Sequence, residues 1–329
     1  MSSLFKRNEF YLGLIILCLV IFLSITTNSF LTIENLLELF TSYSFLGIMA
    51  AGMLVVLISG GLDLSFTATA TISQYIMATT IIKYGGNLFI AFLIGAGIGI
   101  ALGLLNGLLV HYIKVHPMII TIATLNLFKG LLMFFSKGKW IYNFPLWFSE
   151  PYDIMVFKNS EGYIYPISLP LFIFIVVLIV TGFLLKYTIL GRKIYAMGGN
   201  KEAARRMGFN LFALTLFVYG YMGFLAGIGS VAHALMVQTV APNAIIGKEL
   251  DVIAAVVLGG ASLLGGSGTV IGTFLGIAMV AIISNAVILL GIPSYWYMIF
   301  LGAIIITSVS ITAYNYKLNM RKEAEIDVA

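Results

Sequence analysis

Long runs of uncharged, mostly apolar residues constrain this sequence more than any other feature. In the run 171–185, apolar residues occupy every side of a helix and do not alternate with polar ones. About 20 such residues cross the hydrocarbon core of a bilayer as a helix. Only 9% of the residues are charged, against roughly 25% in a soluble domain. The missing alternation argues against an outer-membrane barrel. We therefore expect an all-α, polytopic membrane protein.

The pattern predicts about ten membrane-spanning helices in a single transmembrane domain, 1–329. They cover roughly 9–28, 42–60, 65–83, 88–113, 118–136, 166–187, 212–235, 250–264, 269–290 and 296–315. The third and eighth are the weakest, because the third is rich in Thr, Ser and Ala and the eighth is short and contains glycine. Eight or nine spans remain the alternative. The first run resembles a signal peptide but is long and lacks a small-x-small cleavage pattern, so we expect an uncleaved helix.

Basic residues gather between 186 and 206 and again near the carboxyl end. Cytoplasmic loops of membrane proteins carry such an excess. Both termini are therefore predicted to be cytoplasmic, with the longest loop, 137–165, outside. The net charge of +5 is dispersed between apolar runs, so it does not indicate nucleic-acid binding. The single cysteine, Cys18, excludes a disulfide framework. His233 has no nearby ligands in the sequence, so no metal site is expected.

Two parts of the sequence resemble each other weakly. Leu62-Asp63 precedes a glycine-containing stretch that reaches Asn106, and Leu250-Asp251 precedes another that reaches Asn285. In the predicted topology the first pair lies on the inner side and the second on the outer side. The two halves, about 42–136 and 212–315, would then form an inverted repeat, which is a recurrent architecture of transporters.

The loop 188–211 is the most charged segment between the termini and predicts a short helix. Asn200 can cap its first turn, and Glu202 suits the positive end of the helix dipole. Arg205 and Arg206 suit the negative end, and Gly208 can terminate the helix. A helix of two turns is marginal by itself, so a partner surface would stabilise it. The small Ala203 and Ala204 would allow that surface to approach closely. An ordinary positively charged inner loop is the alternative interpretation.

The same loop, 191–208, resembles the cytoplasmic coupling segment of sugar-type ABC importer permeases, the ribose, arabinose, xylose and autoinducer-2 group. Further similar segments occur in the expected order over nearly the whole chain. They are Gly60-Gly-Leu-Asp-Leu-Ser65, Asn106-Gly-Leu-Leu-Val110, 117–130, the glycine-rich block 250–268 and Gly272-Thr-Phe-Leu-Gly276. The departures are Phe66-Thr-Ala-Thr after the early aspartate motif, and Ala123 and Lys129 in place of a commoner Gly and Arg. These departures bear on substrate identity more than on mechanism.

The resemblance implies a membrane-embedded pair of permeases, either two copies of this chain or this chain with a paralogue. It also implies ATP-binding-cassette ATPase subunits and an extracytoplasmic solute-binding protein in the cytoplasmic (inner) membrane of a bacterium. ATP and Mg would be bound by the ATPase, and no cofactor is expected in this chain. The coupling contacts would come from Gly199, Asn200, Lys201, Glu202, Ala203, Ala204, Arg205, Arg206 and Gly208.

The segment 259–268 has the glycines of a phosphate-binding loop but not its lysine. Gly266 occupies that position, so the chain is not expected to be an ATPase itself. No nucleophile and base occur at a recognisable spacing, which argues against any enzyme. A secondary, ion-coupled transporter of a small polar solute is the alternative function.

Several polar residues lie in or beside the predicted spans. We expect Asp63 and Asp251 to cap the helices that follow them, because a capping acid explains such positions better than a proton path does. Neutral amides suit hydroxyl-rich solutes but also join helices by hydrogen bonds. The candidates for the substrate path are Gln74, Asn106, Asn126 and Asn285.

Overall fold

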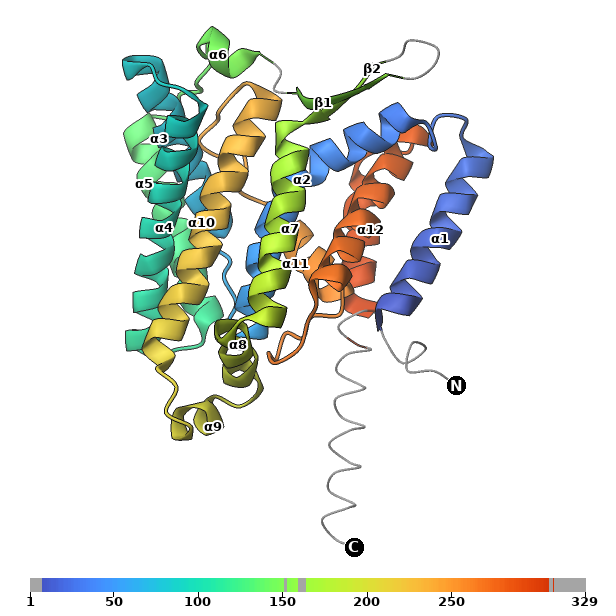
Figure 1. Cartoon of the computed structure of the whole chain (residues 1–329). Helices are drawn as coiled ribbons and strands as arrows, with labels where there is room; N and C mark the ends of the chain where they lie inside the picture. The colour runs from blue at the N-terminus through green and yellow to red at the C-terminus, as the bar shows by residue number, and fades with distance from the viewer. Residues whose placement is uncertain (1–7, 151–152, 159–163, 308–309, 311–329) are drawn as a thin grey trace, which may run out of the picture.

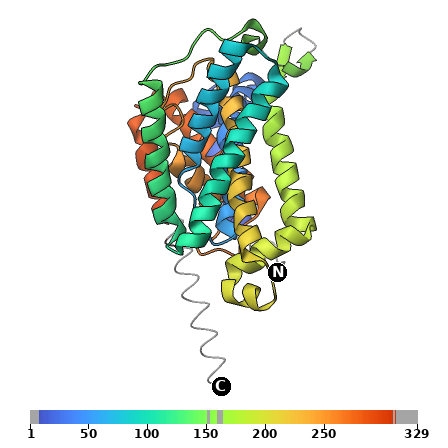
Figure 2. The same ribbon diagram turned by 90° about the vertical axis from the view of Figure 1, so that its left-hand side faces the viewer.

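Long helices run side by side between two ends of the molecule (Figures 1 and 2). The computed structural model describes residues 8–150, 153–158, 164–307 and 310. The long helices are α1 (Asn8–Thr26), α2 (Ile33–Ile58), α3 (Phe66–Tyr84), α4 (Leu88–Ile113), α5 (Pro117–Ser136), α7 (Leu169–Tyr187), α10 (Leu211–Val237) and α12 (Val270–Leu289). The shorter elements are α6 (Leu146–Ser149), α8 (Ile189–Gly199), α9 (Lys201–Arg206), α11 (Glu249–Leu258), β1 (Asp153–Lys158) and β2 (Ile164–Ser168).

Each of the ten predicted spans overlaps a helix, although residues 308–309 and 311–315 of the tenth span, 296–315, lie outside the described residues. Not all of these helices have the length and composition of a membrane span. Within the described residues, seven do: α1, α2, α4, α5, α7, α10 and α12. α3 is long enough but contains five threonines, at 67, 69, 71, 79 and 80, and α11 has 10 residues. The last helix is described as Tyr295–Thr307. An all-α polytopic membrane protein is therefore confirmed, and α3 and α11 are the two spans that the sequence marks as weakest.

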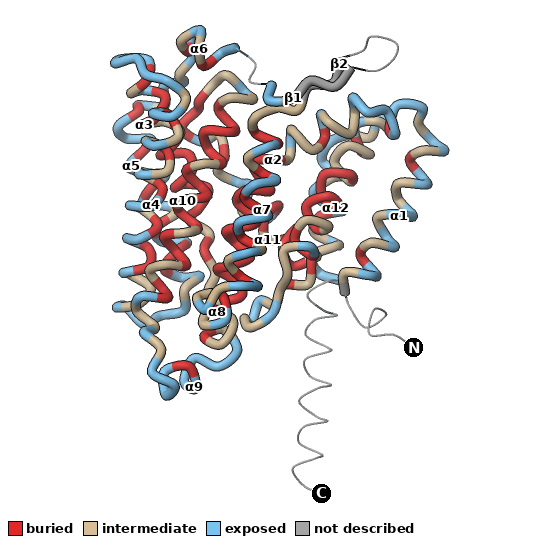
Figure 3. Tube along the Cα trace, viewed as in Figure 1, coloured by how far each residue is buried: buried red, intermediate tan, exposed pale blue. Residues whose placement is uncertain are grey.

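α2 forms the centre of the fold, whereas α1 lies at its edge. From Ser44 to Ile58 every residue of α2 is buried, as expected for a helix that is apolar on all sides. α1 packs on α12 and leaves most of its apolar side chains exposed (Figure 3). Exposed apolar side chains on a spanning helix suit contact with lipid.

Glycines allow α4 and α10 to pack closely. A β carbon on Gly99 would lie 2.1 Å from the carbonyl oxygen of Gly223, and one on Gly227 would lie 2.2 Å from that of Gly95. Spacing glycines four residues apart puts them on one face of each helix, the arrangement that lets backbones approach in membranes. This contact joins segments that are more than 100 residues apart in the chain.

The two ends of the molecule carry different elements (Figure 1). One, here called the α6 end, has α6 and the antiparallel hairpin of β1 and β2, in which Asp153 lies opposite Ser168. The sequence predicts only a loop there. The other, the α9 end, carries α8 and α9.

α3 and α11 begin beside each other. The contact between their first turns is a hydrogen bond that the Thr67 hydroxyl donates to the Glu249 carboxylate. α3 then runs to the α6 end, where the Tyr75 hydroxyl donates to the carbonyl oxygen of Lys139. α11 runs to the α9 end, where Gly266 follows it. Opposite directions of corresponding helices are what an inverted repeat requires. The repeat itself stays a prediction.

Candidate coupling segment and interior polar sites

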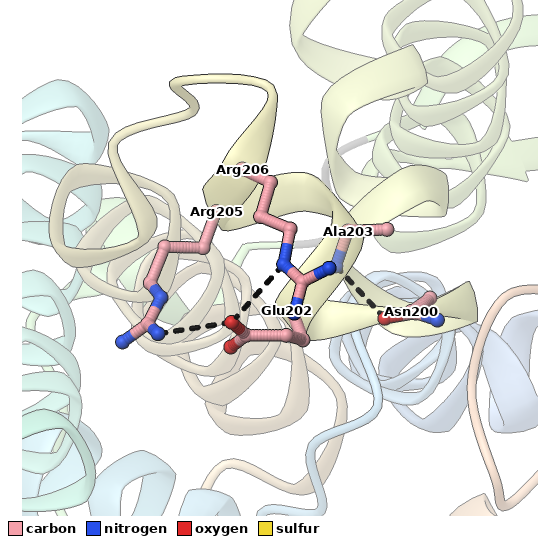
Figure 4. Close-up of polar contacts among 5 residues, drawn as sticks. All are labelled: Asn200, Glu202, Ala203, Arg205 and Arg206. Carbon is pink, nitrogen blue, oxygen red and sulfur yellow. Dashed lines mark hydrogen bonds and ion pairs between the residues drawn. The ribbon is translucent and has the colours of Figure 1, made fainter.

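α9 is a short helix with a cap at its start (Figure 4). The Asn200 side-chain oxygen accepts a hydrogen bond from the backbone N–H of Ala203 at 2.9 Å. The Glu202 carboxylate pairs with Arg205 at 2.9 Å and with Arg206 at 3.5 Å. These three side chains are exposed, so their pairs add little stability. The helix dipole nevertheless favours their positions, because Glu202 lies in the first turn of α9 and the two arginines lie in the last turn.

α9 ends in a Schellman motif. The N–H of Gly208 donates to the carbonyl oxygen of Arg205, and the N–H of Phe209 donates to that of Ala204. Gly208 has a φ of 79°, a conformation that glycine adopts without strain. Capped at both ends, this six-residue helix is held in place by local contacts although its length alone would leave it marginal.

Only one of the two alanines of α9 is available to a partner. Ala203 is exposed, but Ala204 is fully buried within this chain. The methyl group of Ala204 is covered by this chain's own residues, so of the two alanines expected to allow close approach only Ala203 is accessible to a partner surface. Gly199 and Lys201 are exposed beside Ala203 and complete the accessible surface.

A contact of three backbone segments lies directly before α9, and we call it the glycine junction. A β carbon on Gly198 would lie 1.8 Å from the carbonyl oxygen of Ile58, where α2 ends. That carbonyl also accepts the N–H of Gly266 at 2.9 Å. Gly60 and Gly266 have positive φ values of 78° and 76°, which favour glycine. The junction thus joins the ends of α2 and α8 to the turn between α11 and α12.

The hydroxyl of Tyr195 on α8 adds a hydrogen bond to this arrangement. It donates to the carbonyl oxygen of Gly268 at 2.7 Å, and burial raises the pKa of this hydroxyl. The glycine-rich segment 259–268 therefore packs against α8 as a structural turn. Neither the junction nor α8 follows from the sequence pattern, although the glycines themselves were visible.

The polar residues around Asp63 form one connected group inside the protein. The Asp63 carboxylate accepts the N–H of Ser65 at 2.8 Å and its hydroxyl at 2.6 Å. The Asn106 side-chain N–H donates to the same hydroxyl oxygen at 2.6 Å. Asp63 therefore fixes the start of α3, although Ser65 is the N-cap residue itself. Asn106 links this start to α4.

Asp251 does not cap α11, contrary to the expectation. It lies in the first turn of the helix, and Lys248 occupies the N-cap position without a capping side-chain bond. The Asp251 carboxylate instead forms an ion pair with the ammonium group of Lys248, at 3.2 Å. The carboxylate of Glu249, the first residue of the helix, accepts hydrogen bonds from the N–H of Gly247 and from the Thr67 hydroxyl.

The other predicted path residues each have a different environment. Gln74 is buried and hydrogen-bonds His233 at 2.9 Å. Asn285 exchanges two hydrogen bonds with Asn35, at 2.9 and 3.3 Å. Asn126 is exposed and donates to the carbonyl oxygen of Ile122 in its own helix. The structure therefore does not bring the four amides together, and it links three of them to other helices.

Comparison with known proteins identifies relatives over most of the chain. A family model described as the permease component of branched-chain amino acid transport systems matches residues 35–309. The ribose import permease protein of Haemophilus influenzae is 33% identical over 93% of this chain and 92% of its own length. The L-arabinose ABC transporter permease protein of Azospirillum brasilense is 31% identical over 95% and 90%. The autoinducer 2 import system permease protein of Salmonella typhi is 30% identical over 86% and 79%. No solved structure matches.

Proposed function

Because this chain belongs to the family of branched-chain amino acid transport system permease components, we propose that it is the membrane permease of an ATP-driven importer. The solute would be a sugar or a sugar-like small polar molecule, as the names of the ribose, arabinose and autoinducer 2 relatives suggest. The similarity along 79 to 92% of the length of these relatives is the observation that carries the proposal. The protein would lie in the cytoplasmic membrane of a bacterium with both termini inside.

The partners in this proposal are ATP-binding-cassette ATPase subunits, an extracytoplasmic solute-binding protein and a second permease, identical or paralogous. ATP and Mg would bind to the ATPase. α9 is the element we propose to dock on it, because α9 is charged, capped at both ends and exposed beyond the bundle (Figures 1 and 4). Gly199 to Arg206 and Gly208 would form or shape this contact, with Ala204 holding α9 to its own domain.

The glycine junction suggests how movement of α9 would reach the membrane. Because Gly198 contacts the end of α2 and the turn after α11, a displacement of α9 would act on both through backbone atoms. α2 forms the centre of the fold, so its movement would change the packing of α7, α10 and α12, which contact it. Alternating access needs such rigid movements of packed elements.

Two of the four amides remain the better candidates for the substrate path. Gln74 and Asn106 each have a buried side-chain oxygen without a hydrogen-bond partner among the described residues. A buried acceptor without a partner is unfavourable, and a hydroxyl-rich solute could donate to it once the path opens. Asn285 is satisfied by Asn35, and Asn126 by its own helix.

A pull-down with a tag at the carboxyl end tests this function. We expect mass spectrometry of the material from native membranes to identify an ATP-binding-cassette subunit. Ala203→Glu should abolish its recovery and the uptake of labelled ribose or arabinose, because a charged side chain would enter the docking surface. Ser267→Glu is the matched control, since it adds the same charge to an exposed position at the α9 end outside α9.

Three results can be distinguished. Loss of the subunit with Ala203→Glu but not with Ser267→Glu supports docking through α9. Recovery of the subunit with both variants means that an importer exists but that docking uses another surface. Solute uptake without any ATPase subunit would contradict the importer and favour an ion-coupled carrier.

A further inference from the structure

A cavity of about 690 Å³ opens at the α9 end, between the α4–α5 turn and the connection from α9 to α10. Two lysines and an arginine line it: Lys114 from the turn, and Lys201 and Arg205 from α9. His111 of α4 lines it as well. No acidic residue is among its lining residues. The cavity therefore gathers positive charge from two segments that are nearly 90 positions apart in the chain.

The charge of this cavity is only partly neutralised within the chain. Arg205 pairs with Glu202, but among the described residues no carboxylate lies within ion-pair distance of Lys114 or Lys201. The first residues of the 27-residue helix α10 also line the cavity, and the amino end of a helix adds positive potential. An anionic group is thus the ligand that the cavity would favour.

The walls indicate where that anion comes from. Val115, Pro117 and Phe212 give the cavity an apolar side. The neighbouring Tyr112 and Ile113 at the end of α4 are 68% and 52% exposed, and α4 and α5 are candidate membrane spans that meet at this turn. The cavity therefore lies where a span leaves the bilayer, with apolar surface on the side of the lipid chains.

We propose that this cavity binds the phosphate group of an anionic phospholipid from the adjacent leaflet. Lys114 would attract the phosphate from the α4–α5 turn, while Lys201 and Arg205 would attract it from α9. A bound lipid would then bridge α9 to the membrane-spanning helices. This inference rests on the charge and the position of the cavity and not on the transport function. Because Lys201 and Arg205 also belong to the surface proposed to dock on the ATPase, lipid binding is measured on this chain without its partners.

Native mass spectrometry of the purified full-length chain tests the proposal. The protein is loaded with phosphatidylglycerol or with phosphatidylcholine of the same acyl chains, and the retained lipid is counted. We expect preferential retention of phosphatidylglycerol, about fivefold weaker in Lys114→Gln, since one basic residue near an anionic surface contributes about that factor. Lys114→Arg should restore it. Higher salt should weaken binding to the wild type.

Lys137→Gln is the matched control. Lys137 follows α5 at the α6 end with a φ of 52°, close to the 56° of Lys114 after α4. Both substitutions thus remove one charge from a left-handed C-cap position, but only Lys114 lines the cavity. If Lys114→Gln does not fold, as judged by its thermal unfolding, Lys201→Gln removes a second lining charge and should weaken lipid retention similarly.

Inorganic phosphate provides a second arm. If phosphate alone raises the unfolding temperature of the wild type but not of Lys114→Gln, while lipid retention is equal in both, the ligand is a soluble phosphate and the lipid assignment fails. Equal lipid retention in the wild type, Lys114→Gln and Lys201→Gln overturns the proposal. Loss of the ATPase subunit from Lys114→Gln, whose position lies outside α9, with unchanged lipid retention would instead assign the cavity to an acidic protein partner.

Discussion

Single side chains hold α9 in shape, and Asn200 is the one that acts at its start. Its side-chain oxygen satisfies the N–H of Ala203, one of the amino-terminal groups that a helix leaves unpaired. In a helix of six residues, one such bond is a large share of the local stabilisation. The exposed ion pairs of Glu202 contribute less.

We therefore expect Asn200→Ala to destabilise α9 locally by about 1 kcal/mol. The measurable result is faster hydrogen exchange of the α9 amides and weaker recovery of the ATPase subunit. Asn210→Ala is the control, because Asn210 caps α10 with the same hydrogen bond, from the N–H three residues on, at 3.0 Å to Ala213. It should leave α9 exchange unchanged. Equal exchange of α9 in wild type and Asn200→Ala would show that the cap is dispensable.

At the scale of elements, the glycine junction brings the ends of α8 and α2 and the α11–α12 turn into backbone contact. The neighbouring glycines at its edge differ sharply. A β carbon on Gly198 would lie 1.8 Å from the Ile58 carbonyl oxygen, whereas one on Gly199 would meet nothing within 4 Å. A backbone atom cannot move aside as a flexible side chain can.

Gly198→Ala should therefore lower the free energy of unfolding by about 1–3 kcal/mol, the usual range for overpacking. Gly199→Ala should change it little. Thermal unfolding of the two full-length variants in detergent measures the difference. If the variants unfold alike, the ends of α2 and α8 are not in the tight contact described. If Gly198→Ala folds but no longer couples ATP hydrolysis to uptake, the junction transmits movement of α9.

At the scale of the whole molecule, the proposed orientation puts the α9 end in the cytoplasm and the α6 end outside. Ser149 and Ser267 are exposed at the α6 and α9 ends, respectively. In a Cys18→Ser background, Ser149→Cys should react with a membrane-impermeant maleimide in intact cells. Ser267→Cys should react only after the cells are permeabilised. The reverse pattern would invert the orientation, and equal labelling of both in intact cells would contradict a closed membrane between the two ends.

Local patterns in the sequence determined the helical, membrane-spanning class and the approximate position of each helix. Hydropathy acts along a continuous stretch, so α4 was predicted with the bounds 88–113 that the structure has. The cap at Asn200 and the stop at Gly208 were also predictable, because a helix end depends on residues only a few positions apart. The weakness of α3 and α11 as spans was visible for the same reason.

Contacts between distant segments were decided only by the tertiary structure. The burial of Ala204, the pairing of Asp251 with Lys248 and the separation of Gln74, Asn106, Asn126 and Asn285 depend on how helices pack. Many arrangements satisfy the same apolar pattern, because lipid tails and helix neighbours are equally apolar. The glycine junction and the basic cavity each need segments far apart in the chain to meet, and no local pattern specifies such a meeting.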